Sequence, residues 1–218
     1  MLSDNTVIAG GIRLSEKETK KKLLESAKKE FLEKGYMRAS LRNICKNAGV
    51  TTGALYFFFR DKKALFAALV EEPLQKLYEI MNAHYQEEIT ETEMVMEQLT
   101  QQDMSGDLET AKQIVHYMYQ YYDEFQLILV KGQGSGYESC VDQFVDITEK
   151  HYRRFADQVT EQMGIERMGG YILHWMAHMQ IDAFVYMLAH EESEEEAMKS
   201  VEAMVQYMVS GWLGLLRQ

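Results

Sequence analysis

Residues 40–62 hold the side chains whose types and spacing best suit recognition of a nucleic acid. The segment reads Ser-Leu-Arg-Asn-Ile-Cys-Lys-Asn-Ala-Gly-Val-Thr-Thr-Gly-Ala-Leu-Tyr-Phe-Phe-Phe-Arg-Asp-Lys. Apolar residues at helical spacing predict two short helices that interlock across Gly49, the permissive residue of the turn. This pattern is typical of a helix-turn-helix, whose second helix enters a major groove of DNA. The hydroxyl, phenol and basic side chains left exposed are of types that contact phosphates and base edges.

The distribution of charge supports this interpretation. The chain of 218 residues carries 23 Lys and Arg against 34 Asp and Glu, a net charge of −11. Residues 1–66 hold 14 of the basic and 7 of the acidic residues, so this segment is positive and the remainder is strongly negative. A basic segment on an acidic body indicates a nucleic-acid-binding domain joined to a second domain. The alternatives are a helical hairpin that serves only packing, and charges that cluster by chance on solvated helix faces.

The elements that must position these residues are predicted to be helices. A single Pro among 218 residues favours long helices with short connections. Ser15 followed by Glu18 is a capping box that starts a helix, and Gly35 is its stop signal. Asp61 is expected to cap a fourth helix that begins at Lys62. Pro73 should kink or end that helix, because it removes a backbone hydrogen bond.

The rest of the chain also reads as helical, and no segment reads as a strand. Further helices are expected over residues 74–88, 91–101, 107–130, 137–163, 167–189 and 193–218. The expected fold class is therefore all-α, with about nine helices. It comprises a flexible N-terminal arm at residues 1–14, a three-helix helix-turn-helix domain at residues 15–66, and a larger helical domain at residues 67–218.

Two runs of residues resemble the signature of a known family. They are Phe31-Leu32-Glu33-Lys34-Gly35-Tyr36, and Ala48-Gly49-Val50-Thr51-Thr52-Gly53-Ala54-Leu55-Tyr56 followed by Phe59-Arg60-Asp61-Lys62 and Leu65-Phe66. Residues 15–66, about a quarter of the chain, are on these grounds similar to the DNA-binding domain of the TetR family of bacterial transcriptional regulators. The remainder agrees with the family only in length and helical content.

The resemblance implies an all-α homodimer with an effector-binding C-terminal domain, and usually repression that a small ligand relieves. By position, the residues of the family that read bases correspond to Thr52, Gly53, Ala54 and Phe57. Those that contact phosphates correspond to Ser40, Thr51, Tyr56 and Lys62, and Arg42 supplies further positive charge. The sequence departs from the family at Phe58, where a phosphate-contacting histidine is common, and at Cys45, where alanine is usual.

Two C-terminal segments are apolar enough to bury more than one face. In Tyr171–Ala189, 15 of 19 residues are apolar or aromatic, and the last helix has the small residues Ala203, Gly211 and Gly214 beside its apolar stripe. Two such helices from each of two chains would form a four-helix interface, whose symmetry matches a palindromic operator. A monomer in which these two helices are simply central is the alternative.

A pocket for an effector would lie among the helices of residues 107–189. Aromatic and polar residues there are candidate lining, although ordinary core packing is the alternative for each: Tyr117, Tyr121, Phe125, Phe144, Tyr152, Trp175 and His178.

Other chemistries have less support. His174, His178 and Asp182 recur every four residues and could bind a divalent metal, but such a stripe is more often solvated or hydrogen-bonded, and no metal or cofactor is expected. Gly132, Gly134 and Gly136 lack the spacing of a phosphate-binding loop. No Ser/His/Asp or Cys/His set supports an enzyme. Two cysteines suggest a reducing compartment, and no apolar run is long enough for a membrane span.

The patterns predict a sequence-specific DNA-binding protein, and the resemblance implies a transcriptional regulator of the bacterial cytoplasm, foremost a repressor released by a small-molecule effector. Its partners would be double-stranded DNA with a pseudo-palindromic operator, the effector, and a second copy of the chain. The alternative is a small-molecule or metal-sensing binding protein with little or no operator function.

Overall fold

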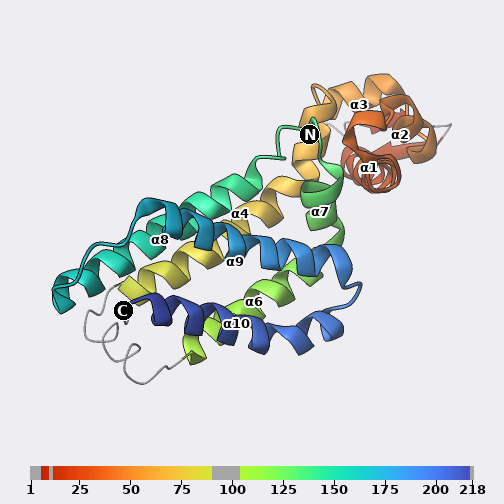
Figure 1. Ribbon diagram of the computed structural model, residues 1–218. Helices are drawn as coiled ribbons and strands as arrows, with labels where there is room; N and C mark the ends of the chain where they lie inside the picture. Colours follow the sequence, from red (N-terminus) through yellow and green to blue (C-terminus); the bar gives the residue numbers. More distant parts are fainter. Residues whose placement is uncertain (1–5, 10–11, 90–103, 217–218) are drawn as a thin grey trace, which may run out of the picture. The chain divides into compact units, whose positions relative to one another are not determined.

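The computed structural model of the protein describes residues 6–9, 12–89 and 104–216 (Figure 1). The chain divides into two compact units. Unit 1 comprises Met1–Leu74 and Asp123–Glu138, and unit 2 comprises Gln75–Tyr122 and Ser139–Gln218. Nine α-helices occur in the described ranges, in agreement with the predicted all-α fold class. None of the helices in these ranges combines the length and apolar character needed to cross a bilayer.

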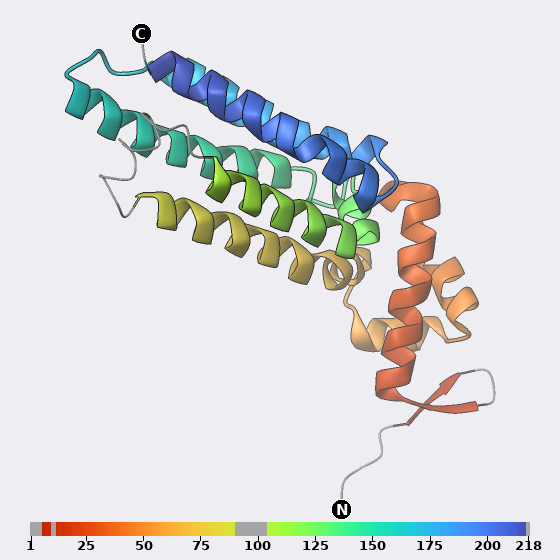
Figure 2. The ribbon, with the colours of Figure 1, turned by 90° about the horizontal axis from the view of Figure 1, so that it is seen from below.

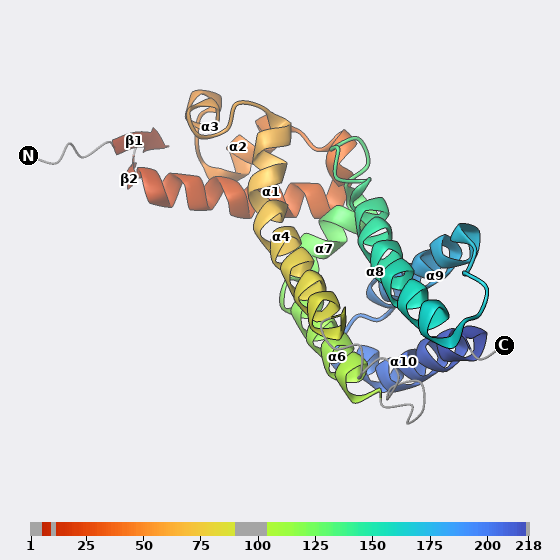
Figure 3. The same cartoon turned by 90° about the vertical axis from the view of Figure 1, so that its left-hand side faces the viewer.

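A short β-hairpin precedes the first helix, where only a flexible arm is predicted. Strands β1 (Thr6–Ala9) and β2 (Ile12–Ser15) pair antiparallel, with Thr6 opposite Ser15 and Ala9 opposite Ile12. Figure 3 shows the hairpin at the beginning of α1. The signal in the sequence is a Gly-Gly pair flanked by β-branched residues, which is typical of a tight hairpin. The expectation that the chain holds no strand is therefore wrong at this point.

The first three helices of unit 1 are α1 (Glu16–Arg38), α2 (Leu41–Ala48) and α3 (Thr52–Phe58). The Ser15 hydroxyl accepts a hydrogen bond from the Glu18 backbone N–H at 3.3 Å, so the predicted capping box is present. Helical geometry in α1 is interrupted at Gly35, whose φ of 72° only glycine adopts readily. Gly49, with φ of 67°, closes α2 in the same way. The predicted start of α1 and the predicted end of α2 are confirmed, whereas α1 continues past the predicted stop at Gly35 to Arg38.

Helix α4 (Lys62–Ile89) begins where predicted but runs through Pro73. Its start is capped by Asp61, whose Oδ1 accepts a hydrogen bond from the Ala64 N–H at 2.7 Å. Proline inside a helix costs about 3 kcal/mol, mainly through a lost hydrogen bond and a clash with the preceding turn. Val70, Leu74 and Leu77, which surround Pro73 in the sequence, are buried and hold the helix in place by packing. The helix therefore does not end at Pro73, and the separate helix predicted over residues 74–88 is the later part of α4.

The helix predicted over residues 107–130 is divided into three pieces. Helix α6 (Ser105–Gln120) ends at Tyr121, α7 (Tyr122–Gln126) follows, and a π-helical turn η1 (Leu127–Lys131) leads into the glycine-rich loop. Phe125, Leu127 and Ile128 are almost fully buried, and η1 packs against α1 within unit 1. Residues 123–138 therefore belong to the N-terminal unit, although they come from the part of the sequence assigned to the C-terminal domain.

Unit 2 is a bundle of long helices. Figures 1 and 2 show α6, α8 (Cys140–Met163), α9 (Gly170–His190) and α10 (Glu194–Leu216) side by side with the later part of α4. One core cluster surrounds Phe155, Leu173 and Trp212, and a second surrounds Val115, Met187 and Val201. The predicted helices at residues 137–163, 167–189 and 193–218 correspond to α8, α9 and α10. The helix expected at residues 91–101 lies outside the described residues.

Candidate nucleic-acid interface

Helix α3 presents one exposed face made of residues one turn apart. Thr52 and Gly53 are exposed at its start, and Tyr56 and Phe57, four positions later, are 57% and 63% exposed. The opposite face is anchored, because Leu55 is fully buried and the following Phe59 is 4% exposed. This arrangement follows from the 3.6-residue period of a helix. The predicted base-reading residues thus lie on one surface, with one exception.

The exception is Ala54, which is only 5% exposed. Its backbone N–H donates a hydrogen bond to the Thr51 hydroxyl at 3.2 Å, which caps α3, and its methyl group packs inward. Ala54 therefore offers little of its surface to a base edge, and its role as a base-reading residue stays a prediction. Thr51 itself is exposed and stands at the N-cap, so its hydroxyl oxygen already serves the helix.

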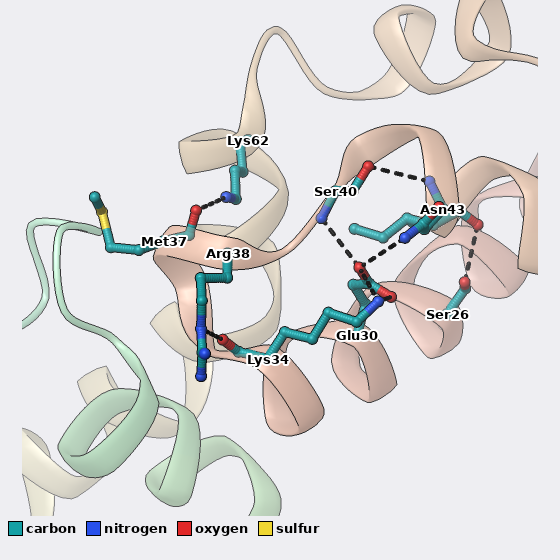
Figure 4. Close-up of polar contacts among 9 residues, drawn as sticks. Ser26, Glu30, Lys34, Met37, Arg38, Ser40, Asn43 and Lys62 are labelled. Carbon is teal, nitrogen blue, oxygen red and sulfur yellow. Dashed lines mark hydrogen bonds and ion pairs between the residues drawn. The ribbon is translucent and has the colours of Figure 1, made fainter.

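A buried carboxylate fixes the helix that precedes α3. Glu30 on α1 is 3% exposed, and its carboxylate accepts hydrogen bonds from the Lys34 ammonium at 2.9 Å, the Ser40 backbone N–H at 3.1 Å and the Asn43 side chain at 3.4 Å (Figure 4). The Ser26 hydroxyl also donates to the Ile44 carbonyl at 2.9 Å. These bonds join α1 to the beginning and the interior of α2. We call Glu30, Lys34, Ser40 and Asn43 the Glu30 network.

The charge state of Glu30 follows from two opposing effects. Burial raises the pKa of Glu30, because it disfavours the ionised carboxylate. The hydrogen bonds from Lys34, Ser40 and Asn43 act in the opposite direction and outweigh burial, so the pKa lies below its ordinary value. The carboxylate is therefore ionised at neutral pH. Within this network Ser40 also caps α2, because its hydroxyl accepts a hydrogen bond from the Asn43 N–H at 3.4 Å.

Lys62, a predicted phosphate contact, is held by the end of α1. Its ammonium donates to the Met37 carbonyl at 3.2 Å (Figure 4). The same ammonium lies 4.7 Å from the centre of the Tyr36 ring. Partial burial lowers the pKa of Lys62, and the charge of Glu30 opposes that effect. A phosphate bound by this lysine would replace or share the bond to Met37.

Further positive charge lies on the elements that flank α3. Arg42 and Lys46 are exposed on α2, and Arg60 and Lys63 are exposed between α3 and the first turn of α4. Arg60 pairs with Asp61 at 3.0 Å, an exposed contact that water weakens. Helix α3 itself carries no charged residue. The surface therefore combines a neutral helix face with basic side chains on the adjoining elements.

The seven candidate residues for an effector pocket take part in several separate contacts. Phe125 is 1% exposed and belongs to the core of unit 1. Phe144 stacks on Tyr78 with ring centres 4.2 Å apart, and Tyr152 stacks on Trp212 at 4.8 Å, so both are engaged in packing within unit 2. The contacts of these three residues are those of core packing, which is the alternative to a role in a pocket.

The other four candidates lie on partly or fully exposed positions. The Tyr117 and Tyr121 rings contact each other, with centres 4.9 Å apart. Trp175 is 47% exposed on α9, and His178 packs edge-on against His174 at 4.7 Å. A pocket of about 280 Å³ in unit 2 is lined by none of the seven; its lining residues are Met104, Ser105, Leu108, Glu202, Val205 and Gln206.

The stripe of His174, His178 and Asp182 is engaged in polar contacts at one end. His174 Nδ1 lies 2.7 Å from a Glu149 carboxylate oxygen, within hydrogen-bond distance. In the part of the chain that the structure describes, no three His, Cys, Asp or Glu side chains are grouped closely enough to hold a metal ion.

A polar and aromatic cluster between α4 and α8 is not anticipated from the sequence. The Tyr78 hydroxyl donates to Gln143 Oε1 at 2.8 Å, and the Tyr85 and Thr148 hydroxyls lie 3.0 Å apart. The Tyr85 ring also stacks on His151 at 4.2 Å. Tyr78 and Tyr85 are seven residues apart, a spacing that places them on one helix face. Thr148 and His151 are three residues apart on α8, which likewise places them on one helix face.

Unit 1 contains the segment that is similar in sequence to known proteins. Residues 23–69 match the family model described as bacterial regulatory proteins, tetR family. The likeness to the family is thus carried by the N-terminal region. The same region is 36% identical over 58 residues to the HTH-type transcriptional repressor Rv1474c of Mycobacterium tuberculosis, and the match covers 27% of this chain and 31% of that protein. It is 42% identical over 53 residues to the HTH-type transcriptional repressor BepR of Brucella suis, covering 24% of this chain and 25% of the other.

The matched segment spans less than a third of the length of these two repressors. The fold resemblance extends further than the sequence match. The crystal structure of NalD of Pseudomonas aeruginosa, described as the secondary repressor of the MexAB-OprM multidrug efflux pump, aligns with a TM-score of 0.54 and 20% identity over 89% of this chain and 95% of NalD. At this identity the likeness concerns the fold, so unit 2 shares the helical architecture of a solved regulator and its ligand chemistry is a separate question.

Proposed function

We propose that the protein is a sequence-specific DNA-binding transcriptional regulator, and that it represses its target genes. The observation that carries this proposal is the exposed face of α3, which the Glu30 network and the buried Leu55 hold in a fixed position on a basic surface. A helix-turn-helix places such a helix in the major groove, and the exposed lysines and arginines on α2 and α4 contact phosphates. The repressor names of its tetR-family relatives support the assignment of repression.

The functional form would be a homodimer that uses α9 and α10. Large apolar side chains on these helices are exposed: Tyr171 is 84%, Trp175 47%, Tyr186 65% and Tyr207 68% exposed. Gly211 and Gly214 follow Tyr207 on α10 by four and seven residues, with open space where a side chain would be. Burial of this surface against the same surface of a second copy gives a two-fold dimer. Two α3 helices related by that symmetry would read two halves of a pseudo-palindromic operator.

A small-molecule effector would bind unit 2 and release the operator. Helix α4 has residues in both units, so a change in the packing of its later part reaches the first turns of the same helix. An effector acts in this way only if it binds the DNA-free arrangement more tightly than the DNA-bound one. Operator function places the protein in the bacterial cytoplasm, with duplex DNA, the effector and a second copy as its partners.

The test is selection of binding sites from a pool of random duplexes, with the full-length protein at near-physiological salt. Enrichment of one palindrome is expected, because a symmetric dimer would read both half-sites. Phe57→Ala should change the preferred sequence, whereas Arg42→Ala should weaken binding to every sequence by a similar factor, since phosphate contacts carry no sequence information. Weak, salt-sensitive binding without any enriched sequence would contradict the proposal and favour a sensing protein without an operator.

A further inference from the structure

The exposed face of α3 lacks the groups that most recognition helices use to read bases. The helix sequence is Thr-Gly-Ala-Leu-Tyr-Phe-Phe, which contains no Arg, Lys, Asn, Gln, Asp or Glu. Arg and Lys read guanine, Asn and Gln read adenine, and Asp and Glu read cytosine through pairs of hydrogen bonds. None of these paired contacts can come from α3. What α3 offers instead is the Thr52 side chain, the phenol of Tyr56 and the phenyl ring of Phe57.

The Phe57 ring is both exposed and held in place. It is 63% exposed, and it meets Phe58 edge-to-face with ring centres 4.9 Å apart. Phe58 in turn contacts Phe59, whose ring is 6.4 Å away and which is 4% exposed in the core of unit 1. The three rings therefore support one another from the core to the surface. Phe58 stands where many relatives are expected to have a phosphate-contacting histidine, and here it supports the neighbouring ring.

Among the four bases, thymine alone presents a methyl group in the major groove, and apolar side chains recognise it by contact. We infer that α3 reads its operator through thymine methyl groups, with the Phe57 ring as the main contact and the Thr52 methyl group as the second. This inference rests on the proposed function. It specifies the chemistry that the recognition helix selects: half-sites with thymine at the positions facing residues 52 and 57.

The basic side chains around the apolar face indicate that its occupant is duplex DNA. Arg42, Lys46, Arg60 and Lys63 are exposed on the elements that precede and follow α3. Such side chains contact phosphates, so they supply affinity without choosing a sequence. Affinity and specificity would thus come from different residues, the first from these four cations and the second from Thr52 and Phe57. An apolar protein partner would give no reason for this positive border.

The experiment replaces thymine by deoxyuridine in the selected operator. Deoxyuridine lacks the 5-methyl group but keeps the same hydrogen-bonding groups and the same phosphates. Dissociation constants are measured by fluorescence anisotropy at fixed salt for each single replacement and for its symmetric pair. Loss of one buried methyl group should weaken binding about four-fold, and loss of the symmetric pair about fifteen-fold.

A double-mutant cycle assigns the contact to a residue. In Phe57→Ala, which removes an exposed ring and should fold normally by circular dichroism, the deoxyuridine effect at the Phe57 position should fall below two-fold. The matched control is Arg42→Ala, which should bind every duplex more weakly and keep the full deoxyuridine effect. Thr52→Ser removes only a methyl group and should abolish the effect at the second thymine.

The outcomes separate this inference from the proposed function. An enriched operator without thymine at the α3 positions overturns the inference, as does equal affinity for the thymine and deoxyuridine duplexes. A deoxyuridine effect that persists undiminished in Phe57→Ala overturns the role of Phe57. In all three cases sequence-specific binding itself is intact, and the proposed function stands. If no sequence is enriched, the proposed function is contradicted, and the inference with it.

Discussion

Removal of the Glu30 carboxylate is expected to loosen α2 and α3 in unit 1 while unit 2 stays intact. Glu30→Ala takes away the acceptor of the Ser40 N–H and the partner of the Lys34 ammonium. A backbone N–H bound to a charged group contributes roughly 1.5–3 kcal/mol. Removing one partner of a buried ion pair costs about 3–5 kcal/mol. The cost for Glu30 and Lys34 should lie near the lower value, because the Lys34 side chain is 34% exposed and can be hydrated. We expect a loss of about 3 kcal/mol in the free energy of local unfolding.

Hydrogen exchange read by mass spectrometry measures this loss in unit 1. A change of 3 kcal/mol corresponds to exchange that is about 100-fold faster in peptides from α1 and α2. Both tryptophans, Trp175 and Trp212, lie in unit 2, so their fluorescence during urea unfolding reports that unit separately and should not change. Glu30→Gln keeps an acceptor for Ser40 and Asn43 but loses the charge, and should show an intermediate effect.

The matched control is Glu33→Ala, which removes an exposed carboxylate from the same helix less than one turn away. Substitutions at such surface positions usually change stability by less than about 0.5 kcal/mol. If Glu30→Ala and Glu33→Ala exchange at the same rate, the Glu30 network does not hold α2, and the reasoning is refuted. Operator affinity should follow the same order, because α3 is positioned through α2.

Three further results are expected. The difference in free energy of unfolding between wild type and Glu30→Gln should be fully present above the pKa of Glu in the unfolded chain, about 4.3. It should shrink as the pH falls through the lowered pKa of Glu30 in the folded protein, which hydrogen exchange of α2 at a series of acidic pH values would show. A difference that grew on acidification would contradict this expectation. Gly49→Ala should destabilise unit 1 by about 1 kcal/mol, because φ is 67° although no atom obstructs the new methyl group; unchanged exchange would show that the turn tolerates a side chain. Gly211→Glu should convert a dimer into a monomer in sedimentation velocity, while Gly106→Glu, at an equally open glycine on α6, should leave the dimer intact; identical sedimentation of both variants would argue against the α9 and α10 interface.

Local signals in the sequence predict the helix boundaries of unit 1 well. Ser15 with Glu18, Gly35, Gly49 and Asp61 each act on a backbone a few residues away, so their effect is visible from sequence alone. The same holds for Ser193, whose hydroxyl accepts the Glu196 N–H at 3.3 Å at the start of α10. The helix-turn-helix and its exposed residues follow directly from these boundaries and the apolar spacing.

Features that depend on distant parts of the chain could not be predicted in this way. Glu30 reads as one more acidic residue on a charged helix, and only the fold shows that Ser40 and Asn43 converge on it. Ala54 looks suitable for a base contact until the packing of α3 turns it inward. Pro73 breaks helices locally, yet buried neighbours keep α4 continuous. The candidate effector residues share aromatic character, but composition does not show that Phe144 stacks on Tyr78 and Tyr152 on Trp212.

Unit 1 is assembled from two stretches of sequence, and this has a consequence for how such a protein can be divided or recombined. The core beneath α1 includes Phe125, Leu127 and Ile128, which are contributed by a segment that comes nearly fifty residues after Leu74. A fragment that stops at residue 66 would leave that apolar surface of α1 uncovered. An exchange of DNA-binding regions between related regulators would therefore need to carry residues 123–138 along with the first 74, or to match their apolar surfaces. The segment that can be exchanged as a unit is thus defined by the residues that pack in one core. It is not a single continuous stretch of sequence.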